Sequence, residues 1–323
     1  MLRRPFAWLA AALSLFAADA LAQAPAWPSE RPVRVVIAWA PGGTTDFVSR
    51  LYARHLGEAL GQSFVVENRP GGSGTIAWNT VARARPDGYT LLISENSLAT
   101  AYPLLPEPRF DPASELSPMA MLVDYPAVFT VPANSPARTI GELFDLARAQ
   151  PDQFNYGSQG NGSGPHLYLE VLQERANFRM THVTYRGMGP AFTDLIAGRL
   201  QLVIAAPPTI LGALRGGQVR VLAISTAGGR IPALPDVPTL REAGIDFTNS
   251  YWYGLFGPRG IEPAVAAKAL EAIRAVNARP DVQATFAEQG GTPLGRDGAA
   301  LGTVLAGELE LWTRLVRERN IRP

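Results

Sequence analysis

Strand-like and helix-like segments alternate along almost the whole chain, and this alternation limits the fold more than any other feature of the sequence. Residues 33–39 form an apolar run with β-branched residues, and apolar side chains then recur at helical spacing from Val48 to Leu60. Further strand-like runs lie at 64–67, 89–93, 127–131, 154–158, 181–185, 200–205, 219–225 and 251–256. This pattern predicts an α/β protein built from doubly wound parallel sheets.

The alternation falls into two series, which predicts two lobes. A proline-rich passage at 103–118 precedes the second series, and three helical segments follow the strand-like run at 251–256. Packed alone, these terminal helices would lack a sheet, so we expect them to return to the first series. The predicted organisation is a first lobe of residues 23–125 with 247–323, a second lobe of 126–246, and two crossover strands beside a hinged cleft. Ligands of such sheets bind at the carboxyl ends of the strands.

The first residues have the composition of an export signal. Arg3 and Arg4 precede the apolar run "FAWLAAALSLFAA", and Ala20 and Ala22 occupy the small-residue positions before Gln23. We therefore expect residues 1–22 to be a cleaved signal peptide, with a general secretion signal favoured over the twin-arginine route. The mature protein should then be soluble in the periplasm.

Composition excludes several classes of function. Cleavage would remove Arg3, Arg4 and Asp19 and leave 27 basic against 27 acidic residues, so nothing favours nucleic acid as a partner. The absence of cysteine excludes disulfides, a thiol nucleophile and a lipid-anchored cysteine. The three histidines lack the close spacing of a zinc site, and no P-loop is present, so we expect neither metal nor cofactor.

Two glycine-rich loops with the same residue pattern each connect a strand to a helix. The first reads "APGGTTD" (40–46), and the second reads "NYGSQGNGSGPH" (155–166). Unpaired N–H groups at both helix starts would hold a carboxylate between the lobes, and each helix dipole would add about 0.3–1 kcal/mol. Simple helix capping explains either loop alone, and Asp46, which would repel a carboxylate, is expected to cap its helix or to order water or an ammonium group. A serine hydrolase using Ser158 or Ser163 with His166 is an unfavoured alternative, because Gly-x-Ser-x-Gly is not in register.

Six motifs, in order, resemble the substrate-binding receptors of tripartite tricarboxylate transporters, also called Bug receptors. They are "PVRVVIAWAPGGTTD", "VVENRPGGSGTIA", "PDGYTLLI", "NYGSQGNGSGPHL", "HVTYRGMGPAFTDLIAGRLQLV" and "LPDVPTLREAGI". The resemblance implies a type II periplasmic binding protein fold, capture of a small carboxylated solute, no enzymatic activity, and delivery by a monomer to a membrane permease. Signalling to a sensor kinase requires the same pair of lobes and stays open as an alternative.

The resemblance also implies a set of ligand contacts, partly through bridging waters. They are Gly42, Gly43, Thr44, Thr45, Asp46, Ser94, Asn96 and Ser97 in the first lobe, and Ser158, Asn161, Gly162, Ser163, His166 and Ala205 in the second. The turn "YRGMGPA" (185–191) and the loops "ENRPGGSGT" and "LPDVPT" are interpreted mainly as structural turns.

The chain departs from the family at Ala205 and Ala206, where a polar pair is usual. We therefore predict a carboxylate ligand that has fewer polar substituents or is more apolar. The aromatic residues available to line its site are Trp39, Tyr102, Tyr251 and Trp252.

Overall fold

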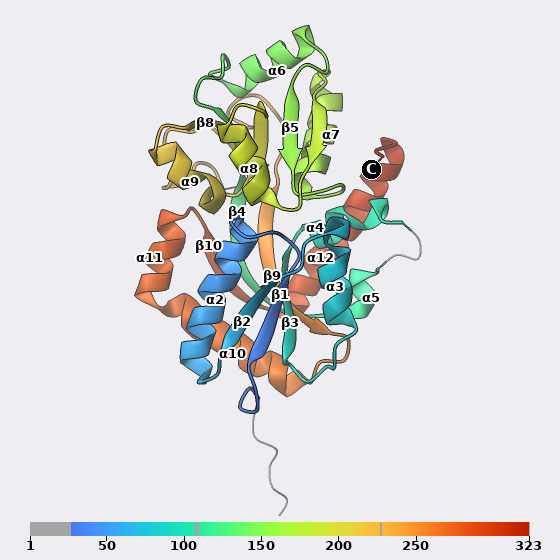
Figure 1. The fold of residues 1–323 in the computed structure, drawn as a ribbon, viewed down its shortest axis with the longest axis vertical. Helices are drawn as coiled ribbons and strands as arrows, with labels where there is room; N and C mark the ends of the chain where they lie inside the picture. The colour runs from blue at the N-terminus through green and yellow to red at the C-terminus, as the bar shows by residue number, and fades with distance from the viewer. Residues whose placement is uncertain (1–26, 107–109, 227, 323) are drawn as a thin grey trace, which may run out of the picture.

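The protein consists of two β-sheets, each covered by helices, that share one long strand. The computed structural model describes residues 27–106, 110–226 and 228–322. The predicted signal peptide lies outside the described residues. Figure 1 shows one sheet with its helices in the lower part of the molecule and the other in the upper part. We call them half A and half B.

In sheet A the strand order is β2-β1-β3-β9-β4-β10. The first three strands are parallel, whereas β9, β4 and β10 run antiparallel to their neighbours. The strands are β1 (Val33–Ile37), β2 (Phe64–Asn68), β3 (Thr90–Glu95), β4 (Leu116–Pro132), β9 (Ser250–Pro258) and β10 (Thr292–Asp297).

In sheet B the order is β8-β4-β7-β5-β6, with β5, β6 and β7 parallel. Its own strands are β5 (Asn155–Ser158), β6 (Thr181–Thr184), β7 (Leu202–Ala205) and β8 (Val219–Ser225). Strand β4 passes from one half to the other: its residues up to Pro126 pair with β9, and those from Ala127 onward pair with β7 and β8.

Helices pack on both sheets. Those of half A are α2 (Thr44–Leu60), α3 (Thr75–Ala82), α4 (Ser97–Thr100), α5 (Pro112–Glu115), α10 (Pro263–Ala278), α11 (Pro280–Glu288) and α12 (Gly298–Glu318), with 3-10 turns η1 (Gly72–Gly74) and η2 (Tyr102–Leu104). Those of half B are α6 (Ile140–Ala149), α7 (Gly164–Ala176), α8 (Met188–Ile196) and α9 (Pro207–Arg215).

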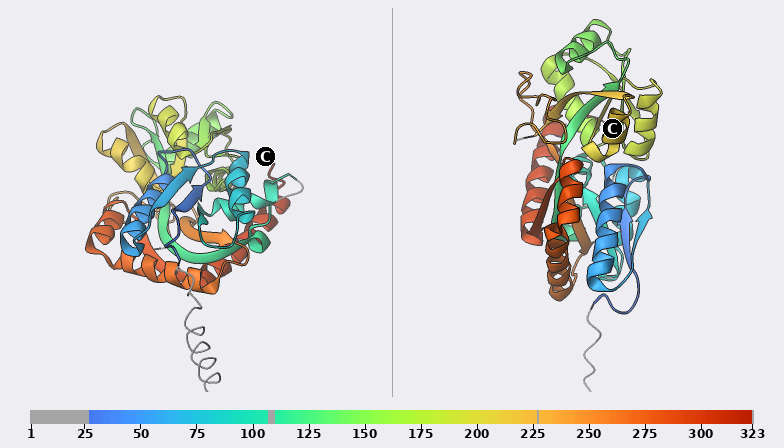
Figure 2. Two further views of the ribbon diagram at one scale, coloured as in Figure 1. Left: turned by 60° about the horizontal axis from the view of Figure 1, so that its bottom comes forward. Right: turned by 90° about the vertical axis from the view of Figure 1, so that its left-hand side faces the viewer.

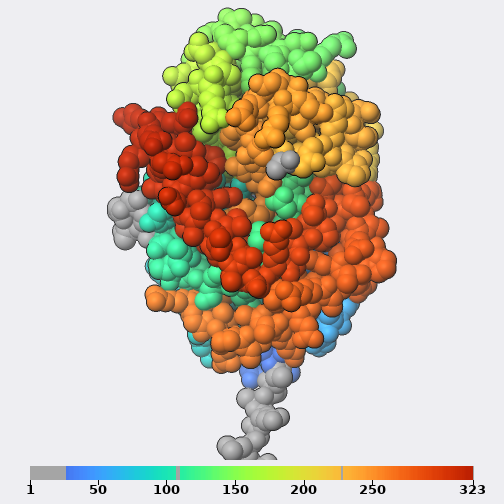
Figure 3. All heavy atoms as spheres, turned by 180° about the vertical axis from the view of Figure 1, so that it is seen from behind, coloured from blue at the N-terminus to red at the C-terminus, as the bar shows by residue number. Residues whose placement is uncertain are grey.

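The side view in Figure 2 shows the two halves placed end to end. From behind, the C-terminal helices, coloured orange to red, cover half A, and the end of the chain reaches half B (Figure 3). An ion pair between Arg319 and Glu174 of α7 fixes that end. None of the helices in the described part of the chain is long and apolar enough to cross a membrane.

The parallel arrangement predicted from the alternation holds for β2-β1-β3 and β7-β5-β6, and the terminal helices pack on half A as expected. Four strands differ from the prediction. Strands β8 and β9 are expected in parallel sheets but pair antiparallel with their neighbours. Strand β4 starts at Leu116, inside the passage interpreted as a proline-rich connection, and β10 lies between two of the terminal helices. Strand β10 carries Pro293 and a register shift against β4, so no clear period marks it in the sequence.

Candidate functional site

A small cavity lies where half A meets half B. Its volume of about 20 Å³ is room for about one water molecule. Both halves line it, with Trp39, Ala40, Gly43, Thr44, Thr45, Asp46, Tyr251 and Tyr253 from half A and Gln159, Met188, Ala205, Ala206 and Thr209 from half B. A solute larger than water therefore requires the two halves to move apart.

The N-termini of three helices converge on this cavity. Helix α2 starts after Gly43 and α8 after Gly187, and α9 starts after Ala206; none of these three cap positions carries a side-chain hydrogen bond to the helix. The starts of α2 and α8 leave N–H groups without intrahelical partners, whereas α9 starts with Pro207 and Pro208, which have no N–H, and contributes only its helix dipole. The partial positive charge of the three helix starts favours an anion in the cavity. Among the described residues, neither lysine nor arginine lines it.

Asp46 lies in the first turn of α2, at the edge of the cavity. Its carboxylate accepts hydrogen bonds from Arg50 Nε (3.0 Å), Asn68 Nδ2 (3.1 Å) and the backbone N–H of Gly42 (3.4 Å). Burial acts to raise the pKa of Asp46, but these donors outweigh burial and hold the pKa below its usual value. Arg50 compensates the charge, and the role of Asp46 as a cap or as a contact to water or an ammonium group stays a prediction.

Direct hydrogen bonds join the two halves around the cavity. The Ala40 N–H donates to the carbonyl of Arg186 at 2.9 Å, and the hydroxyls of Thr44 and Thr209 lie 2.9 Å apart. Glycines allow the backbones to approach: a Cβ on Gly187 would lie 2.9 Å from Ala40 N. The turn "YRGMGPA" is therefore a contact between the halves as well as a helix start.

Glu95, at the end of β3, is a fully buried carboxylate behind the cavity wall. Its Oε1 accepts hydrogen bonds from Trp39 Nε1 (2.9 Å) and from Gln159 Nε2 of half B (3.0 Å), and its Oε2 accepts one from the Ser97 N–H (2.7 Å). Burial raises the pKa of Glu95 although these donors act to lower it. Sequence analysis selected Ser94, Asn96 and Ser97 around it but missed Glu95, an acidic residue that ends an otherwise apolar strand.

The second glycine-rich loop is held from behind by a stack of three rings. The rings of His166 and His182 lie 4.1 Å apart at 8°, and Tyr156 stacks on His182 at 4.8 Å. His166 Nδ1 accepts a hydrogen bond from the Gly162 N–H at 3.0 Å, and His182 Nε2 lies 2.6 Å from Ser158 Oγ. Burial lowers the pKa of His166 to about 4 and that of His182 to about 3.

This arrangement does not form the nucleophile pair of the hydrolase alternative. The His166 ring contacts the backbone of its own loop, and Ser158 contacts His182 instead. The Ser163 hydroxyl donates to the carbonyl of Gly160 at 2.7 Å. Both serines are buried, and neither hydroxyl is hydrogen-bonded to His166.

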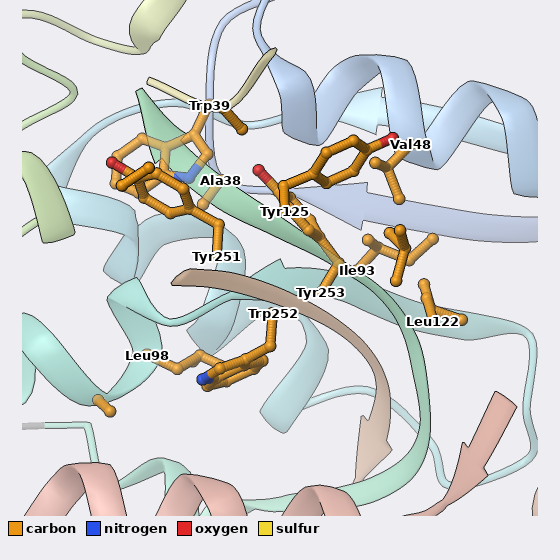
Figure 4. Packing of buried hydrophobic residues seen from close by; sticks show 14 of the residues in the cluster. Ala38, Trp39, Val48, Ile93, Leu98, Leu122, Tyr125, Tyr251, Trp252 and Tyr253 are labelled. Carbon is orange, nitrogen blue, oxygen red and sulfur yellow. The ribbon is translucent and has the colours of Figure 1, made fainter. Parts of the chain in front are cut away.

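Alternation along β9 decides which aromatic residues reach the cavity. Figure 4 shows Tyr251 and Tyr253 on the side of the strand that faces Trp39, and Trp252 on the opposite side. Trp252 Nε1 donates there to Glu308 at 2.9 Å. Trp39 and Tyr251 thus line the cavity as the sequence suggested, whereas Trp252 and Tyr102 are not among its lining residues.

The structure brings five of the predicted site residues to the cavity: Gly43, Thr44, Thr45, Asp46 and Ala205. Gly42 lines an adjoining groove of about 630 Å³ at the outer edge of the contact between the halves. The remaining predicted residues do not line the cavity, and their role as ligand contacts stays a prediction; they are Ser94, Asn96, Ser97, Ser158, Asn161, Gly162, Ser163 and His166.

Sequence analysis missed Gln159, Met188, Thr209 and Tyr253. Met188 lies in the turn "YRGMGPA", a helix entry interpreted from the sequence mainly as structural. The signal for Thr209 was weak, because α9 follows no glycine-rich loop. Within the described residues, no group of three or more histidine, aspartate or glutamate side chains is arranged to hold a metal ion.

Two α/β halves that share β4 and enclose a cavity at helix N-termini define the fold of a periplasmic binding protein. Residues 48–321 match the model of the tripartite tricarboxylate transporter family receptor. The chain therefore belongs to this family of periplasmic solute-binding receptors.

Three relatives show the extent of the similarity. Protein BugT of Bordetella pertussis is 32% identical over 97% of this chain and 98% of its own length. A Rhodopseudomonas palustris protein solved with adipate is 31% identical with a TM-score of 0.87, covering 92% of this chain and 99% of that one. MatC of the same organism, solved with bound malate, is 31% identical with a TM-score of 0.84, covering 89% and 99%.

Proposed function

We propose that this protein is an extracytoplasmic receptor that captures a small carboxylated metabolite between its two halves and delivers it to a tripartite tricarboxylate-type membrane permease. Residues 1–22 would direct export to the periplasm and then be removed. The receptor would act without a cofactor, without catalysis and as a monomer.

One observation carries the proposal: three helix N-termini from both halves converge on one cavity that no lysine or arginine of the described chain lines. Backbone N–H groups at the starts of α2 and α8, and the hydroxyls of Thr44, Thr45 and Thr209, are the donors there. Donors of this kind suit a carboxylate. The malate and adipate in the two related structures are carboxylates of the same class.

Capture would use the two halves as lobes that close on the solute. The proposed boundaries near residues 125 and 247 lie next to Pro126, where β4 changes its partners, and next to Ser250, where β9 begins. A ligand can drive closure only by its better interaction with the closed form. Contacts from α2 on one side and α8 and α9 on the other would supply that difference.

The test is mass spectrometry of small molecules released from the purified protein, followed by calorimetry and small-angle scattering with each candidate. We expect a carboxylic acid, binding that survives treatment with a chelator, and a smaller radius of gyration in its presence. Recovery of a solute without an acidic group, or turnover of a carboxylic ester that is lost when Ser158 is replaced by alanine, would contradict the proposal.

A further inference from the structure

Glu95 is a buried carboxylate that forms no ion pair with any residue in the described part of the chain. Its exposed fraction is 1%, and among the residues that the structure describes neither lysine nor arginine forms an ion pair with it. All of the partners identified for it are neutral donors. Asp46, the other carboxylate near the cavity, has Arg50 as its counter-ion. Because a buried carboxylate without a counter-ion is costly to ionise, a positive group placed beside Glu95 would stabilise its charged form.

The side chains of Trp39 and Gln159 connect Glu95 to the cavity. Trp39 and Gln159 both line the cavity, and both donate to the same oxygen, Oε1. Trp39 belongs to half A, as Glu95 does, whereas Gln159 follows β5 of half B. Separation of the halves would therefore remove the Gln159 amide and leave one acceptor position of Glu95 open to the cleft.

The size of the cavity indicates that the Gln159 amide occupies a position that a solute would take. Because the cavity has room for about one water molecule, a solute that binds when the halves close again fits only where a side chain that now fills the site moves aside. The Gln159 side chain donates hydrogen bonds to Glu95 (3.0 Å) and to the Ser97 hydroxyl (3.3 Å). Its NH₂ group marks where a donor of the solute would sit.

We propose, on the basis of the proposed receptor function, that Glu95 determines specificity by binding a protonated amino group, so that the preferred solute is a zwitterion with both a carboxylate and an ammonium. The carboxylate of the solute lies at the helix N-termini of α2, α8 and α9. Its ammonium takes the place of the Gln159 amide on Glu95 and supplies the missing counter-charge. Ala205 and Ala206 offer no polar side chain from half B, so the amino group is recognised from half A. This proposal replaces the expectation that the solute is a carboxylate with few other polar groups.

The experiment compares solutes that differ only in the group that Glu95 would contact. Calorimetry of the wild-type protein compares succinate, malate and aspartate, which carry hydrogen, hydroxyl and ammonium on the same carbon atom. Adipate and 2-aminoadipate repeat the comparison of hydrogen with ammonium on a longer chain. We expect the amino compound of at least one series to bind at least tenfold tighter than its amino-free counterpart, about 1.4 kcal/mol.

Two variants assign the preference to Glu95. Glu95→Gln removes the charge and should reduce the preference to less than about threefold, whereas Glu95→Asp keeps the charge and should retain its direction. The matched control is Glu67→Gln, the same change at a carboxylate of half A that pairs with Arg34 and Arg69 outside the cavity. Thermal melts check that each variant folds, and the wild-type comparison stands even where a variant does not.

The outcomes separate this inference from the receptor function. If succinate or malate binds as tightly as aspartate or tighter, and adipate as tightly as 2-aminoadipate or tighter, the proposed role of Glu95 is wrong. The proposal that the protein is a carboxylate receptor would still hold. Failure of all five solutes to bind also overturns it, while the receptor function is decided separately by the solute recovered from the purified protein. That solute should contain a basic nitrogen, and a nitrogen-free carboxylate would refute the inference alone.

Discussion

Replacing Gly162 with alanine should prevent full closure while leaving both halves folded. Gly162 belongs to the loop before α7 in half B, and a Cβ built on it would lie 2.6 Å from the Cα of Ala101 in half A. Ordinary contacts between carbon atoms are about 3.5–4.0 Å. The two backbones would therefore have to separate by about 1 Å at this point.

Such a shift would lengthen the bonds between the halves beyond hydrogen-bonding distance. The Thr44–Thr209 contact and the bond from the Ala40 N–H to the Arg186 carbonyl, both at 2.9 Å, would approach 4 Å. Each such bond contributes about 0.5–1.5 kcal/mol, so their loss weakens the closed form by about 1–3 kcal/mol. Ligand affinity should accordingly fall by roughly tenfold or more, which is about 1.4 kcal/mol.

A matched control removes the effect of backbone strain. Gly162 has φ +77° and Gly198 has φ +76°, but a Cβ on Gly198 would meet nothing within 4 Å. Both substitutions to alanine carry the same left-handed strain of about 1–2 kcal/mol, whereas only the one at Gly162 opposes closure. Small-angle scattering and calorimetry on both variants decide the question. If Gly162→Ala bound the recovered solute and compacted as Gly198→Ala does, the loop would not be part of the closing contact.

Three further predictions concern stability and closure. The pKa values of His166 and His182 lie below 6.5 in the folded protein, so the unfolded chain binds more protons than the folded protein as the pH falls. The free energy of unfolding should therefore drop by about 2 kcal/mol per ring between pH 7 and pH 5. Denaturant titrations should show a smaller drop in a variant with both histidines replaced by glutamine. Asp46→Asn should lower the free energy of unfolding by about 1–3 kcal/mol at pH 7, and the difference from wild type should vanish only at acid pH below the usual aspartate pKa, because the pKa of Asp46 is lowered. Thr209→Val removes the hydroxyl contact with Thr44 and should weaken solute binding by about 0.5–1.5 kcal/mol in calorimetry without changing the melting temperature of the open form; unchanged affinity would exclude that contact from closure.

The glycine-rich loop at the start of α2 was predictable because its information is local. Gly43, the two threonines and Asp46 follow a strand and start a helix, and the structure places them at the cavity. The matching loop before α7 has the same local pattern, yet its Ser158 and His166 face the ring stack behind the cavity. The pattern identifies a helix start but not the direction in which the helix start faces.

The sequence by itself determined the α/β class, the existence of two series of strands and the family, because hydrophobic period and turn chemistry act between residues close in the chain. Tertiary structure decided what surrounds the cavity. Glu95 and Gln159 are 64 positions apart, and their hydrogen bond exists only because the halves meet. Contacts of this kind depend on how the sheets are placed, and β4, which pairs in both, sets that placement. The spacing of residues along the sequence does not predict how the two sheets are placed.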